Sequence, residues 1–96
     1  MTRQQLNDWL AERDLDQQQP HLLLLTEEHY DAAFLGVTER DGLAVAVYDA
    51  RKCVEALVST GMSYEDAEEW FEFNTRSAYV GPTTPIFVDS PAAGDL

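Results

Sequence analysis

Residues 34–48 read FLGVTERDGLAVAVY, and this stretch decides the fold. Two β-prone runs occupy residues 34–39 and 43–48, and the connection between them contains a glycine, Gly42. Two such runs around a short glycine-containing connection predict a β-hairpin. Apolar residues occur on both faces of the second run, so helices cover both sides of the sheet or one side is only thinly covered. One face holds Leu43, Val45 and Val47, and the other holds Ala44, Ala46 and Tyr48.

Two helices are predicted after the hairpin. Asp49 is a natural N-cap for a helix over about 49–60, and Gly61 ends it. The apolar positions of this helix repeat at helical spacing: Ala50, Cys53, Val54, Leu57 and Val58. Ser63 opens a second helix with a capping-box pattern, and we expect this helix to span about 64–79, before Gly81 and a following proline.

The N-terminal third is less regular. Thr2 can cap a first helix whose apolar stripe contains Leu6, Trp9 and Leu10. Residues 14–20 are polar, end in a proline and predict a connection. Residues 22–25 are all leucine, so periodicity cannot separate a strand from a helix, and we favour a strand. We expect Thr26 to cap a short helix that ends near Ala33.

Together these elements predict one α+β domain over residues 1–88. It has an N-terminal helix, a small antiparallel sheet built on the 34–48 hairpin, two consecutive helices packed on the sheet, and a short C-terminal strand at residues 86–88. Residues 89–96 have the composition of a flexible tail.

Composition limits the class of protein. A chain of 96 residues with a 45% apolar share can fold around one core but not two. The single cysteine, Cys53, excludes an intrachain disulfide and a thiolate metal site. No apolar run approaches the roughly 18 residues of a membrane span, and the first residues lack the apolar core of a secretory signal. We therefore expect a soluble cytoplasmic protein.

Charge gives the strongest compositional signal. Eighteen acidic and six basic residues give a net charge of −12. Repulsion from phosphates makes direct binding to nucleic acid unfavourable. The acids are spread evenly over both halves of the chain, so the charge belongs to the folded body. Lys52 is the single lysine beside five arginines, a bias that is also expected of a salt-adapted organism.

The predicted second helix carries an acidic ridge. Glu65, Glu68, Glu69 and Glu72 fall within an arc of about 100° on a helical wheel. Asp66 and Phe73 border this arc, while Ala67, Trp70, Phe71, Asn74 and Ala78 are expected to face inward. The ridge is either an ordinary solvated face or a surface that binds a basic protein and imitates a row of phosphates. A divalent-cation site is a third reading, but no EF-hand spacing supports it.

Catalytic and cofactor patterns are not found in the sequence. His21 and His29 lack the spacing of metal ligands, and Cys53 falls on the apolar face of its helix, where a thiol behaves as a small hydrophobe. The glycines form no phosphate-binding loop, and the serines have no nucleophile-elbow context. We therefore predict no catalytic residue, no metal and no cofactor.

Several motifs in the C-terminal two thirds of the chain resemble a known group of proteins. They are residues 61–67, 70–74, 78–81 and 84–87. The stretch is similar to a family of small uncharacterised proteins common in bacteriophage and prokaryotic genomes, and the similarity covers roughly residues 31–88. The family has no assigned chemistry. The resemblance implies a setting in which small proteins bind and block host machinery, including restriction and CRISPR effectors.

The sequence thus favours a non-enzymatic acidic interaction module. We expect it to bind a basic protein surface, such as that of a nucleic-acid-handling complex, through Glu65, Asp66, Glu68, Glu69, Glu72 and Phe73. One alternative is a structural or regulatory protein whose acidity reflects a salty habitat. The other alternative is a small ligand-binding domain or enzyme, which predicts a deep pocket with converging polar groups.

Overall fold

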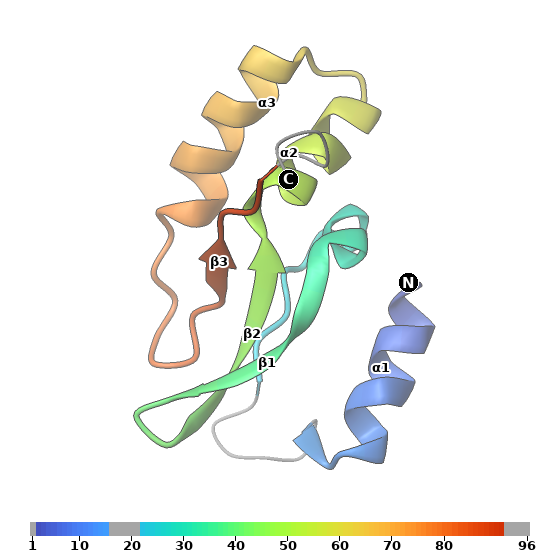
Figure 1. The fold of residues 1–96 in the computed structure, drawn as a ribbon, viewed down its shortest axis with the longest axis vertical. Helices are drawn as coiled ribbons and strands as arrows, with labels where there is room; N and C mark the ends of the chain where they lie inside the picture. Colours follow the sequence, from blue (N-terminus) through green and yellow to red (C-terminus); the bar gives the residue numbers. More distant parts are fainter. Residues whose placement is uncertain (1, 16–21, 92–96) are drawn as a thin grey trace.

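The computed structural model describes residues 2–15 and 22–91. Figure 1 shows α2 and α3 together at one end of a small sheet, with α1 beside β1. The α+β class is confirmed, as are the N-terminal helix, the hairpin, the two consecutive helices and the short last strand. The elements in chain order are α1 (Arg3–Glu12), the 3₁₀-helix η2 (Glu28–Ala33), β1 (Phe34–Arg40), β2 (Leu43–Asp49), α2 (Ala50–Ser59), α3 (Tyr64–Phe71), the π-helical turn η3 (Glu72–Arg76) and β3 (Ile86–Val88).

The hairpin forms where the sequence predicts it. β1 and β2 pair in antiparallel fashion, with Arg40 opposite Leu43 at the turn. The two turn residues, Asp41 and Gly42, have φ angles of 54° and 81°. Positive φ at both central residues is the requirement of the tight turn that matches the twist of a hairpin, and Asp-Gly is a preferred pair for it.

The third strand makes the sheet mixed, whereas we expected an antiparallel sheet. β3 pairs with β2 in parallel, so the strand order is β1-β2-β3. The chain between β2 and β3 passes through α2, α3 and η3 before it returns to the sheet. A helical crossover of this kind brings a strand back in its original direction, while a short turn would reverse it.

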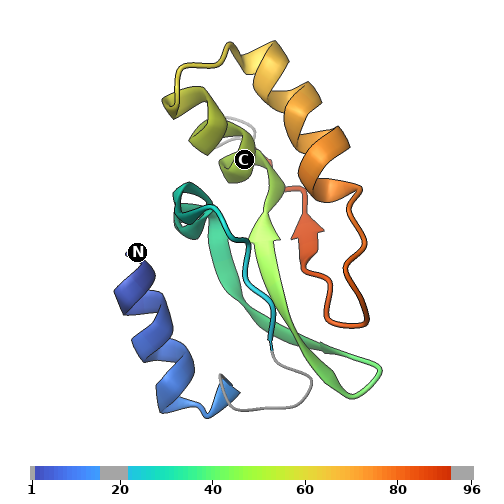
Figure 2. The same ribbon diagram turned by 180° about the vertical axis from the view of Figure 1, so that it is seen from behind.

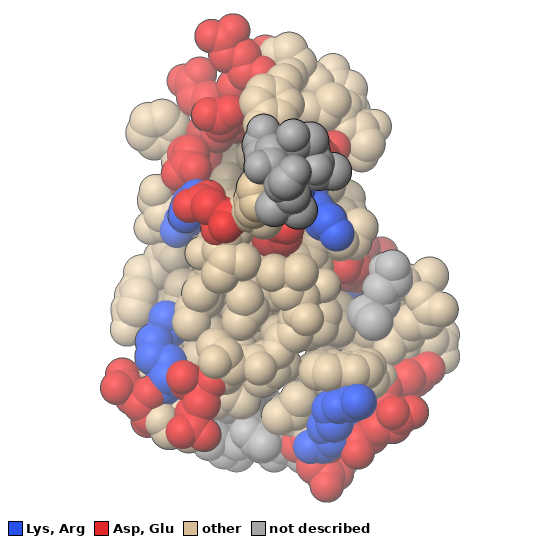
Figure 3. Space-filling model, viewed as in Figure 1, with Lys and Arg blue, Asp and Glu red and all other residues tan. Residues whose placement is uncertain are grey.

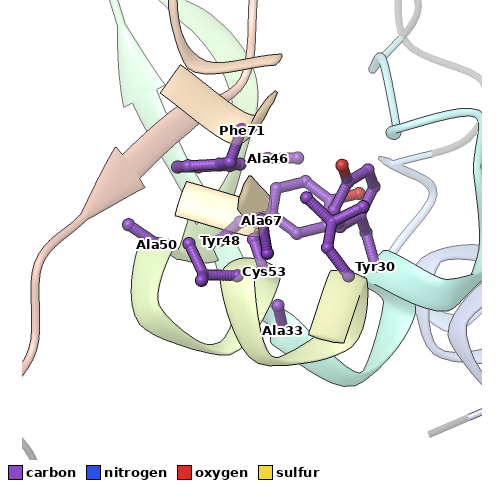
Figure 4. Close-up of a cluster of buried hydrophobic side chains, with 10 residues drawn as sticks. Tyr30, Ala33, Ala46, Tyr48, Ala50, Cys53, Ala67 and Phe71 are labelled. Atoms are coloured by element: carbon purple, nitrogen blue, oxygen red, sulfur yellow. The ribbon is translucent and has the colours of Figure 1, made fainter. Parts of the chain in front are cut away.

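The core lies between the sheet, α2, α3 and η2. Figure 4 shows Tyr30, Tyr48, Cys53 and Phe71 among the side chains of this cluster, and all four are 2% exposed or less. The ring of Phe87 on β3 stacks on Tyr48 at 6.0 Å and meets Phe71 edge-on at 5.2 Å. Aromatic contacts therefore tie the short strand to both the sheet and α3.

Segment 22–25 is neither strand nor helix. It is irregular and lies against the sheet, where the backbone N–H of Leu25 donates to the hydroxyl of Tyr48 at 3.0 Å. Arg3 on α1 also holds this segment, because its Nη2 donates to the carbonyl oxygen of Leu25 at 2.9 Å. Four leucines are apolar enough to be partly buried, but among the residues that the structure describes no strand pairs with them through backbone hydrogen bonds.

The ends of the helices follow local rules with two exceptions. The side chains of Thr2, Asp49 and Ser63 accept backbone N–H bonds at the starts of α1, α2 and α3, as predicted. Thr26 does not cap η2, whose N-cap is Glu27 without a side-chain bond. The predicted helix over 64–79 is shorter, with α3 ending at Phe71 and η3 at Arg76.

Side chains explain the early end of α3. The amide of Asn74 donates to the carbonyl oxygen of Trp70, and the hydroxyl of Ser77 donates to that of Glu72. Such bonds compete with the backbone hydrogen bonds that would continue a helix.

Part of the predicted tail contacts the body of the domain. Asp89 receives two hydrogen bonds of 3.0 Å from Arg76, and Ser90 donates to the buried carboxylate of Asp49 at 2.8 Å. Arg51 donates to the carbonyl oxygen of Pro91 at 2.9 Å. The rest of the predicted tail, most of the predicted 14–20 connection and His21 lie outside the described residues.

Candidate functional site

The predicted binding residues lie together along α3 and the start of η3. All of them are exposed, and Phe73 is 75% exposed. Figure 3 shows acidic side chains gathered over the end of the molecule where α3 lies. We call this surface the acidic face, and it comprises Glu65, Asp66, Glu68, Glu69, Glu72 and Phe73.

Most of the acidic face has no positive partner. Within residues 2–15 and 22–91, no ion pair reaches Glu65, Asp66, Glu68 or Glu69, and Lys52 forms none. The five arginines bind other groups. Four of them form ion pairs: Arg3 with Asp31 and Glu28, Arg13 with Glu12, Arg51 with Glu55, and Arg76 with Glu72 and Asp89. Arg13 also lies over the ring of Trp9, and Arg40 donates to the carbonyl oxygens of Pro82 and Thr84. Five of the six basic side chains are therefore already engaged.

Like charges three or four positions apart also destabilise the helix that carries them. Glu68 and Glu69 each have acidic neighbours at such spacings, in Glu65 and Glu72. Each like-charge pair costs about 0.2–0.5 kcal/mol. Glu65 and Asp66 stand in the first turn of α3, where the helix dipole favours acids. The fold gives no such compensation to Glu68 and Glu69.

Exposed aromatic rings border the carboxylates. Tyr64, Trp70 and Phe73 are 54%, 51% and 75% exposed. The expectation that Trp70, Asn74 and Ala78 face inward is wrong, since all three are exposed, whereas Ala67 and Phe71 are buried as predicted. The helical-wheel prediction assumes that residues 64–79 form one continuous α-helix with a wide apolar stripe. α3 instead buries a narrow stripe, and the π-helical turn changes the phase after Phe71.

Two shallow depressions cross the acidic face. The first is lined by Tyr64, Glu65, Glu68, Glu69, Glu72 and Phe73. The second is lined by Met62, Asp66, Glu69, Trp70, Phe73 and Asn74. Glu69 and Phe73 belong to both, so a carboxylate and a large exposed ring stand side by side at the centre of the surface.

An apolar hollow of about 260 Å³ adjoins this surface and was not expected from the sequence. Residues 23–27 line one side, while Asn74, Thr75, Ala78 and Val80, together with Thr84, Pro85 and Phe87, line the rest. Figure 2 shows the segment before η2 crossing the face of the sheet. The lining comes from three separate segments, so no local pattern could have revealed it.

Cys53 and Asp89 lie outside the acidic face, and the fold shifts the pKa of each. Burial, together with the negative charge of Asp49, raises the pKa of the Cys53 thiol to about 12, so this group stays protonated at neutral pH. The hydrogen bonds and charge of Arg76 lower the pKa of Asp89. Within the described residues, no group of three or more His, Cys, Asp or Glu side chains is placed to hold a metal ion.

Comparisons with known proteins add no relative. No family model, no curated protein and no solved structure matches this chain. None of the described helices combines the length and apolar character needed to cross a membrane. Function is therefore inferred from the geometry and the sequence of this chain.

Proposed function

We propose that this protein is a non-enzymatic interaction module and that its acidic face binds a basic surface on a protein partner. The observation that carries the proposal is the set of exposed, unpaired carboxylates on α3, which stand beside exposed aromatic rings. Carboxylates supply electrostatic complementarity to lysine and arginine. Aromatic rings supply the apolar contact area on which protein interfaces depend.

The chemistry of the acidic face favours a partner that handles nucleic acid. A row of carboxylates along a rigid helix presents negative charge at regular intervals, as phosphates do, and the net charge of −12 opposes binding to nucleic acid itself. A more specific form of the proposal adopts the setting that the resemblance to small phage-associated proteins implies. In that form, the protein inhibits a host restriction or CRISPR complex by occupying its nucleic-acid-binding surface.

Acidity that reflects only a salty habitat is the main alternative. A habitat bias accounts for the even spread of acids over the chain, but it gives no reason for exposed aromatic rings to accompany the acids of α3. Tyr64, Trp70 and Phe73 all lie within the stretch that carries the carboxylates. This coincidence favours an interaction surface over a purely solvating one.

Affinity capture with matched variants tests the proposal. The ridge variant Glu65→Lys/Glu68→Lys/Glu69→Lys leaves Glu72 in place, because Glu72 pairs with Arg76. The control variant Asp8→Lys/Glu12→Lys/Glu39→Lys has the same net charge, but its changes lie on α1 and β1. We expect wild type and control to capture the same basic protein from native extract and the ridge variant to lose it. Equal capture by all three would contradict the proposal.

Competition for nucleic acid tests the more specific form. Once a partner is captured, we expect the protein to displace nucleic acid from it at low salt and to lose this effect as ionic strength rises. A partner that binds both at the same time would show that the acidic face does not imitate phosphates.

A further inference from the structure

The apolar hollow beside η3 is small enough for its occupant to be a single side chain. Its volume is about 260 Å³. Pockets for small molecules and cofactors commonly measure about 300–1,000 Å³, whereas a cavity of about 150 Å³ holds one benzene molecule. The hollow therefore has room for one large apolar side chain, such as that of leucine or phenylalanine.

One wall of the hollow is fixed by the hairpin. Arg40 at the end of β1 donates to the carbonyl oxygens of Pro82 and Thr84, at 3.0 and 2.9 Å. The hydroxyl of Thr84 accepts the backbone N–H of Val80 at 2.9 Å. These bonds hold the connection between η3 and β3 in a defined shape.

The opposite wall is fixed from two sides. Leu25 is bonded through its N–H to Tyr48 and through its carbonyl oxygen to Arg3. The hydroxyl groups of Tyr30 and Thr75 are 3.3 Å apart and join η2 to η3. The hollow is thus built before any ligand arrives, which lowers the entropic cost of filling it.

The hollow adjoins the acidic face. Asn74 lines both the hollow and the depression that contains Asp66, Glu69 and Phe73. Glu27 adds a carboxylate to the lining of the hollow. An apolar side chain in the hollow would therefore lie beside Glu27 and close to the acidic face, where basic neighbours on the same partner are favoured.

Building on the proposed function, we propose that the hollow receives one large apolar side chain from the basic partner, while lysines or arginines flanking that side chain face Asp66 and Glu69. Interfaces commonly obtain most of their affinity from a few such anchors in preformed pockets. The acidic face then steers and orients the partner, and the hollow retains it.

Two peptides of defined sequence test the anchor. One is a short lysine-rich helical peptide with a single leucine, and the other has alanine in place of the leucine. We expect the leucine peptide to bind about tenfold or more tightly, because the hollow buries apolar carbon atoms of leucine that alanine lacks. Titration of the ¹⁵N-labelled protein should move the amide signals of Leu24, Thr75 and Val80.

Protein variants separate the anchor from the acidic face. Ala78 is exposed and lines the hollow, so Ala78→Leu should fill the hollow and abolish the advantage of the leucine peptide while leaving the alanine peptide unaffected. Val80→Ser, at the 61% exposed rim, serves as a second variant if Ala78→Leu does not fold. The control Leu35→Ser alters an exposed apolar residue on β1, outside the hollow, and should change neither affinity. The ridge variant should weaken both peptides.

The outcomes are distinct. Equal binding of the two peptides to wild type would overturn the anchor and leave the proposed function standing. Failure of both peptides to bind at low salt would contradict the proposed function as well. If dilution of the free protein moved the same amide signals, the occupant would be a second copy of this chain, and the anchor proposal would be wrong.

Discussion

The consecutive helices α2 and α3 pack on the same sheet but differ in what they bury. α2 buries Ala50, Cys53, Val54 and Leu57, whereas α3 buries only Ala67 and Phe71. On its exposed side, α2 pairs Arg51 with Glu55, while like charges stand together on α3. The difference indicates that α2 mainly stabilises the fold, while α3 presents a surface whose composition the fold does not require.

Truncation of one apolar residue on each helix should show the largest difference. Leu57→Ala on α2 should lower the free energy of unfolding by about 2–5 kcal/mol, because the leucine is buried in the core. Trp70→Ala on α3 should lower it by less than about 1 kcal/mol, because the ring is half exposed. Chemical denaturation of both variants measures this. If the two variants lost a similar free energy of unfolding, the two helices would not differ in how much they stabilise the fold.

The helix caps give a second, smaller contrast. Asp49→Ala should cost about 2 kcal/mol, because the buried carboxylate bonds both Lys52 N–H and Ser90. Ser63→Ala should cost about 1 kcal/mol or less, since its hydroxyl makes one exposed bond to the N–H of Asp66. Thermal unfolding of the two variants under the same conditions compares them, and a larger loss for Ser63→Ala would reverse the ranking.

Alkaline titration should reveal the burial of Cys53 on α2. The folded pKa is about 12 against an ordinary value of 9.0, so between these values the unfolded chain releases the thiol proton and the folded chain keeps it. The free energy of unfolding should therefore fall as pH rises above 9, by about 1 kcal/mol per pH unit from this group. Cys53→Ala should show a correspondingly shallower fall. Tyr48, whose pKa burial also raises to about 12, contributes to the fall in both proteins.

Removal of like charges from α3 should have the smallest effect on stability, and the opposite sign. Glu68→Gln/Glu69→Gln should raise the free energy of unfolding by about 0.5–1 kcal/mol at low salt, because it relieves repulsion from Glu65 and Glu72. The gain should shrink in about 1 M salt, where charges are screened within about 3 Å. If the variant were destabilised, the acids would be serving the fold, and the case for an interaction surface would weaken.

Much of the local structure could be predicted because local rules govern it. Asp41 and Gly42 suit the hairpin turn, and Asp49 and Ser63 cap their helices through atoms only a few residues away. The exposure of Glu65, Glu68 and Glu69 also follows from helical spacing. The prediction that Trp70 faces inward is wrong because the width of a buried stripe depends on what packs against the helix. The stripe that the helical wheel predicts is wider than the stripe that α3 buries.

The contacts that the sequence does not predict join residues that are distant in the sequence. Arg3 binds Asp31 and Leu25, Arg40 binds Pro82 and Thr84, and no local pattern selects these pairs. The same contacts decide that segment 22–25 is irregular and that the connection before β3 forms one wall of a hollow.

The sequence by itself determined the hairpin, the helix starts, the net charge and the acidic face, since each depends on backbone preferences or spacing within a few residues. The tertiary structure alone decided the parallel pairing of β3, the exposure of Trp70 and the apolar hollow beside η3. These features depend on which distant segments pack together, and that choice is made by the core as a whole.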